Sequence, residues 1–130
     1  MSFVLGVHLF LVYLIWTFGG LGTIWGIVLL VRKRGIDSIM RALLYITAGL
    51  GVLQAAMGGI LYLSGARPGH PGSLDSNLHF VYGLIVLIGI PVAFVYASNK
   101  SARRDMIVYT IAIAAVAAAA VRAFMTGFPM

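Results

Sequence analysis

Histidine is the residue type in this chain best suited to binding a metal, because the sequence contains three histidines and no cysteine. His8 and His79 lie in apolar segments long enough to cross a membrane, where ionisable side chains are rare and functional by default. His8 lies near the start of the first segment and His79 near the start of the third, so both stand close to the same membrane face. His70 lies in the polar loop before the third segment and is expected to be solvent-exposed.

Two facing imidazoles suit the iron of a b-type haem, which takes two axial nitrogens from helices that leave room for the porphyrin. Haem also needs small residues beside the ring and cations for its propionates near the polar boundary. The sequence offers such a set at Gly58, Gly59, Tyr82, Gly83 and Arg122, with Arg67 as a second candidate cation. Each histidine alone is more often a hydrogen-bonded interfacial side chain, and Arg122 alone an interfacial anchor. Zinc is disfavoured because a closed zinc site takes four ligands.

The composition is that of an integral membrane protein. Of the 130 residues 62% are hydrophobic and only 9% are charged, whereas soluble domains have about 25% charged residues. The three acidic residues are all aspartates in loops or at helix ends, which excludes catalysis by paired carboxylates. The net charge of +6 arises in short loops beside membrane spans, so we predict no nucleic-acid partner.

Four apolar stretches, at about residues 3–31, 39–63, 78–97 and 106–128, reach the roughly 20 residues that a spanning helix needs. The first is far longer than the apolar core of a signal peptide, so we interpret it as a permanent span. Seven of the nine basic residues lie in or beside the first and third connections, which the positive-inside rule places in the cytoplasm. The sequence therefore predicts a single all-α domain. The predicted arrangement is an up-down-up-down four-helix bundle in a prokaryotic cytoplasmic membrane, with both termini on the outer side.

Small residues recur at helical spacing and predict close helix contacts. In the first span His8 shares a face with Ile15 and Gly22, which follow at intervals of seven, so this face is expected to point into the protein. In the second span Gly51 and Gly59 belong to a stripe of small residues at intervals of four, the usual pattern of a packing seam.

Two residues interrupt the apolar spans. Gln54 is strongly polar and needs a partner, which could be the backbone of a neighbouring helix, a water molecule or a substituent of a cofactor. Pro91 lacks an N–H and is expected to bend the third helix about one turn earlier.

The segments LQAAMGGILYLSG and LHFVYG, separated by a proline-containing loop, resemble part of the haem A synthase family. The resemblance covers Leu53 to Gly83 and implies one four-helix half of that family's bundle. It implies His79 as one axial ligand, His8 as the opposite one, and Gly58 and Gly59 at the haem edge. The chain lacks the family's catalytic Glu, because it contains no glutamate, and Leu9 stands where the family has arginine. An electron carrier is therefore favoured over a haem-modifying enzyme.

These observations predict a membrane-embedded haem b protein with bis-histidine ligation near the outer face, acting in electron transfer. The alternative is a cofactor-free accessory or assembly subunit of a respiratory membrane complex. A small transporter is disfavoured because no acidic residue lies near the middle of a span. Expected partners are the lipid bilayer and either a second copy of the chain or a larger membrane redox complex, since the resembling family packs two such halves together.

Overall fold

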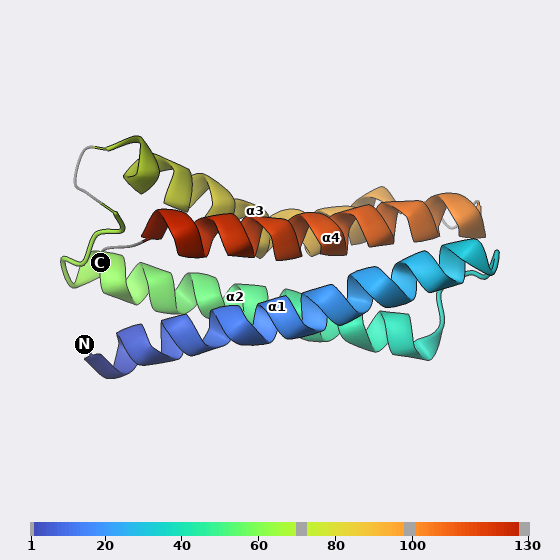
Figure 1. Cartoon of the computed structure of the whole chain (residues 1–130), viewed down its shortest axis with the longest axis horizontal. Coiled ribbons are helices and arrows are strands. Elements are labelled where there is room, and N and C mark those ends of the chain that lie inside the picture. The colour runs from blue at the N-terminus through green and yellow to red at the C-terminus, as the bar shows by residue number, and fades with distance from the viewer. Residues whose placement is uncertain (1, 70–72, 98–100, 128–130) are drawn as a thin grey trace.

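The computed structural model describes residues 2–69, 73–97 and 101–127 of the chain. In this part the chain forms four helices, α1 (Ser2–Val31), α2 (Ser38–Leu63), α3 (Leu74–Tyr96) and α4 (Ala102–Gly127), shown in Figure 1. Each helix is long and apolar enough to cross a membrane. The predicted all-α architecture of four membrane-length helices is therefore confirmed. Helices α3 and α4 begin before the expected apolar spans, because each starts with a polar first turn.

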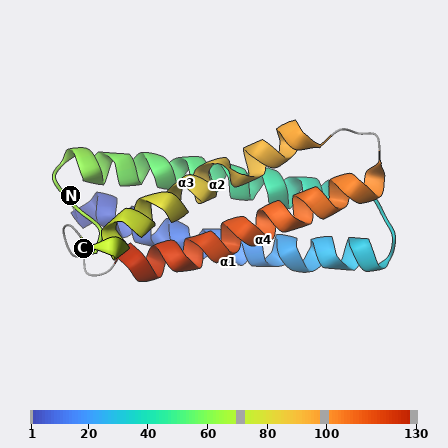
Figure 2. The ribbon, with the colours of Figure 1, turned by 90° about the horizontal axis from the view of Figure 1, so that it is seen from above.

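The helices lie lengthwise beside one another (Figures 1 and 2). The first turns of α1 and α3 and the last turns of α2 and α4 share one end of the bundle, which we call the histidine end. The opposite end carries Arg32, Lys33 and Arg34 and is called the basic end. Helix α1 packs against α2 and α4, and α3 packs closely on α4 but more loosely on α2. Within the described ranges the backbones of α1 and α3 do not touch, so these two helices are diagonal partners.

Glycines allow α1 and α4 to approach closely. A Cβ atom added at Gly26 would lie 2.5 Å from the Thr110 hydroxyl, and one at Gly19 would lie 3.1 Å from the Ala117 Cβ. His8 and Ile15 are both buried, with 7% and 0% of their surface exposed. This confirms that the face of α1 carrying His8 and the small residues points into the protein.

The small-residue stripe of α2 serves two different purposes along its length. A Cβ atom at Gly51 would lie 2.5 Å from the carbonyl oxygen of Val86, so α2 and α3 cross there in backbone contact. Towards the histidine end the two helices diverge (Figure 1), and Ala55 and Gly59 line a cavity. Only the Gly51 part of the predicted seam is therefore a packing contact.

Asp37 connects α1 to the start of α2 at the basic end. Its carboxylate accepts a hydrogen bond of 2.8 Å from the Met40 N–H, which caps α2, and bonds of 3.0 Å from the Trp25 indole. Partial burial acts to raise the pKa of the Asp37 carboxyl, but these hydrogen bonds outweigh it and hold the pKa below its ordinary value. The contribution of this group to stability is therefore present above its ordinary pKa and is lost as the pH falls through the lowered one.

We predict that Gly51→Ala destabilises the bundle by about 1–3 kcal/mol, because the added methyl group meets a backbone carbonyl that cannot rotate away. The matched control is Gly49→Ala, where an added Cβ has no neighbouring atom within 4 Å. The measurement is reversible unfolding in mixed detergent micelles, followed by helix content. Equal stability of the two variants would contradict the backbone contact between α2 and α3.

Candidate functional site

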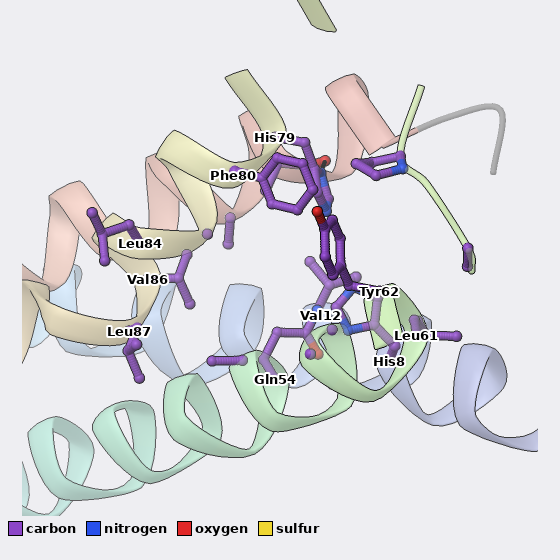
Figure 3. Close-up of a pocket in the computed structure, with 18 of the residues that line it drawn as sticks. His8, Val12, Gln54, Leu61, Tyr62, His79, Phe80, Leu84, Val86 and Leu87 are labelled. Carbon is purple, nitrogen blue, oxygen red and sulfur yellow. Dashed lines mark hydrogen bonds between the residues drawn. The ribbon is translucent and has the colours of Figure 1, made fainter. Parts of the chain in front are cut away.

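The histidine end brings His8 and His79 together from the diagonal helices α1 and α3. Their ring centroids lie 6.4 Å apart and the ring planes are inclined by 63°. Figure 3 shows the two side chains entering from opposite sides of one cavity. The sequence predicted that His8 and His79 lie at the same depth, and in the structure the two imidazoles lie beside each other.

The separation of the two rings fits a shared metal ion. Imidazole nitrogens bind first-row metals at about 2 Å, so two opposed rings that share one ion have centres roughly 6 Å apart. The observed distance of 6.4 Å between the ring centroids is close to this spacing. Within the described residues no group of three or more His, Cys, Asp or Glu side chains could hold a metal.

His79 is oriented by the backbone of α4. Its Nδ1 lies 2.7 Å from the carbonyl oxygen of Ala123, and since a carbonyl can only accept, Nδ1 carries the proton. The lone pair is then on Nε2. Histidines that bind metals usually donate their other ring N–H to a carbonyl or carboxylate in this way, which fixes both the tautomer and the ring orientation.

His8 packs against α2 and has an unmet polar atom. An added Cβ at Gly58 would lie 3.3 Å from the His8 Cε1, so the glycine makes room for the ring. The buried Nδ1 of His8 has no hydrogen-bond partner in the described part of the chain. A buried nitrogen without a partner costs free energy unless something outside the protein chain satisfies it.

Both histidines line a cavity of about 800 Å³ between α2 and α3 (Figure 3). This volume lies in the range of roughly 300–1,000 Å³ that is usual for ligand sites. The walls are mainly apolar, and glycines at positions 58, 59 and 83 widen the space. An added Cβ at Gly59 or Gly83 has no neighbouring atom within 4 Å, so both residues border open volume.

Few polar groups face this cavity. Gln54 lines the cavity, and its side-chain oxygen is buried and accepts no hydrogen bond from the described residues. At the mouth, the Arg67 guanidinium lies 3.9 Å from the centre of the Tyr62 ring. Its Nη1 donates to the carbonyl oxygens of Tyr62 and Ala66 at 2.7 and 2.8 Å. An apolar slot with a few fixed polar groups is the usual form of a cofactor site.

The structure places the other predicted residues as follows. Tyr82 and Arg122 do not belong to the described cavity lining, and the Arg122 guanidinium lies 5.7 Å from the Tyr82 ring centre. Arg122 is exposed and its Nη1 approaches the Met125 sulfur at 3.9 Å. His70 lies outside the described residues. The geometry therefore brings Arg67, not Arg122, to the cavity with the two histidines.

The sequence did not point to two residues of the site. Ala123 contributes only a backbone carbonyl, which carries no side-chain signal. Tyr62 follows Gly58 by one helical turn, so the spacing that identified the glycines also places Tyr62 on their face.

Comparisons with protein-family models, with curated proteins and with solved structures find no match to this chain. The resemblance to the haem A synthase family therefore stays a prediction. Any function of this chain must therefore be inferred from the geometry of the two histidines and the cavity at the histidine end.

Proposed function

We propose that this chain is a membrane-embedded haem b protein in which His8 and His79 are the axial ligands, and that it serves electron transfer. The observation that supports this best is the pair of imidazoles with centres 6.4 Å apart in the wall of a cavity of about 800 Å³. When bound, haem supplies one-electron oxidation and reduction of its iron. The resemblance of Leu53 to Gly83 to the haem A synthase family adds to this proposal.

Different residues of the chain would orient the two histidines and line the space for the cofactor. The Ala123 carbonyl orients His79, while Gly58 leaves the space that His8 occupies. The walls of the cavity are mainly apolar, which suits the apolar body of a porphyrin. Two histidine ligands leave no open coordination position, which favours electron transfer over binding of oxygen or substrate.

The alternative function is that of a cofactor-free accessory or assembly subunit of a respiratory membrane complex. Such a subunit needs no paired imidazoles and no interior cavity. The paired imidazoles and the apolar cavity that they line favour a ligand-binding role. The homodimer and the larger redox complex expected from the sequence both stay predictions.

The orientation that we propose puts the histidine end, with both termini, on the outer side of a prokaryotic cytoplasmic membrane. The support comes from the basic residues of the described chain that lie at the opposite end of the bundle. They are Arg32, Lys33, Arg34, Arg41, Arg103 and Arg104.

We expect the purified protein to show the reduced-minus-oxidised spectrum of a six-coordinate, low-spin haem b, with a pyridine extract identifying the haem. His8→Ala and His79→Ala should each abolish this spectrum or convert it to a high-spin form, because each removes one axial nitrogen. His70→Ala is the control and should leave the spectrum unchanged. An unaltered Soret band in the double variant His8→Ala/His79→Ala would show that the axial assignment is wrong.

The absence of cysteine allows a clean test of orientation by single-cysteine labelling. Ser64→Cys probes the histidine end and Ser101→Cys the basic end, and both serines are exposed. With a membrane-impermeant maleimide on cells with an opened outer barrier and an intact inner membrane, we expect only Ser64→Cys to react. After permeabilisation both should react equally. Labelling of Ser101→Cys alone in intact membranes would reverse the proposed topology.

A further inference from the structure

We infer that Arg67 is the carboxylate-binding residue of this cavity, and that the site selects an apolar ligand bearing acid groups at one edge. This inference rests on the proposed function, in which the acid groups are the propionates of haem. It assigns the polar edge of the ligand to the connection after α2, at the mouth of the cavity.

The Arg67 side chain is held in place before any ligand arrives. It packs on the Tyr62 ring at 3.9 Å, and Nη1 donates to two backbone carbonyls. The Nε and Nη2 groups make no hydrogen bond within the described residues. Because guanidinium is a planar fork that matches a carboxylate, these remaining N–H groups form a prepared set of donors for the oxygens of an acid group.

The charge of Arg67 is not neutralised by the described part of the chain. The ion pair found there joins Arg104 to Asp105 at 3.7 Å, and both residues lie at the basic end. The described cavity lining contains neither Asp nor Glu, and Arg67 is its sole arginine or lysine. A ligand with a negative edge therefore meets, at the mouth, a cation that forms no ion pair within the described residues, and apolar walls behind it.

The position of Arg67 also suits the solvation of a carboxylate. Arg67 follows the end of α2 and is exposed, so an acid group beside it keeps contact with water while the apolar body enters the cavity. Arg122 lies inside the α4 span, over Tyr82 and away from the lining. Of the two cations that the sequence offered, we therefore assign this role to Arg67 and not to Arg122.

The test compares haemin with its dimethyl ester, which lacks the two acid groups but keeps the porphyrin. Apo-protein in detergent is titrated with each ligand and the Soret band is followed. For the unaltered chain we expect the acid to bind about tenfold more tightly than the ester, the scale of a charge-assisted hydrogen bond at a partly hydrated site.

Arg67→Gln should bind acid and ester with the same affinity, and Arg67→Lys should keep part of the preference because it keeps the charge. Arg122→Gln is the matched control, since it removes an exposed arginine that does not line the cavity, and it should keep the full preference. If Arg67→Gln and Arg122→Gln both lose the preference for the acid over the ester, the effect is one of general charge and the assignment to Arg67 is overturned.

The two proposals fail separately. If Arg67→Gln keeps the full preference for the acid while the spectrum still requires His8 and His79, the Arg67 site is wrong and the haem function stands. If no variant or ligand gives a spectrum that depends on the histidines, the haem function is wrong. The probe is then a fluorescent long-chain fatty acid and its methyl ester. A preference for the acid that disappears in Arg67→Gln supports the carboxylate site, and equal binding of acid and ester overturns it.

Discussion

The backbone contact between Gly51 and Val86 is the constraint on which the site depends. It brings α2 and α3 together, with an added Cβ at Gly51 placed 2.5 Å from the Val86 oxygen. Beyond this crossing, towards the histidine end, α3 leans away from α2 (Figure 1). The close contacts of α1 with α4 at Gly19 and Gly26 lie on the other side of the crossing, towards the basic end. The cavity therefore lies in the part of the bundle where α2 and α3 separate. A larger residue at position 51 would move the crossing point and with it the walls of the cavity.

A cavity of about 800 Å³ with unmet polar atoms is costly in a membrane protein. Lipid tails are as apolar as the walls, so expulsion of water provides no force that closes the gap. The buried His8 nitrogen and Gln54 oxygen each lack a partner in the described chain, and lipid cannot supply one. A ligand that binds the imidazoles of the folded chain stabilises that chain by an amount that rises with the logarithm of the ligand concentration divided by Kd.

The helices and the histidine pairing could be predicted from sequence, and the placement of cations could not. Uncharged runs fix where a helix can cross the membrane, and the rise per residue then sets His8 and His79 at one depth. The rotation of α4 about its axis is set by packing, since alanines surround Arg122 on nearly every face. Hydropathy could not show that Arg122 faces Tyr82, nor that the Ala123 carbonyl faces His79.

The last turn of α4 holds both His79 and the loop that carries Arg67. The Ala123 carbonyl holds His79, and four residues later the Gly127 carbonyl accepts a hydrogen bond of 3.0 Å from the Gly69 N–H. Gly69 has a φ of +61°, and an added Cβ would lie 3.0 Å from the Thr126 oxygen, so only glycine fits there without strain. Since Arg67 precedes Gly69 by two residues, the same helix end positions both the imidazole and the cation. A shift of this turn would therefore move both sides of the site together.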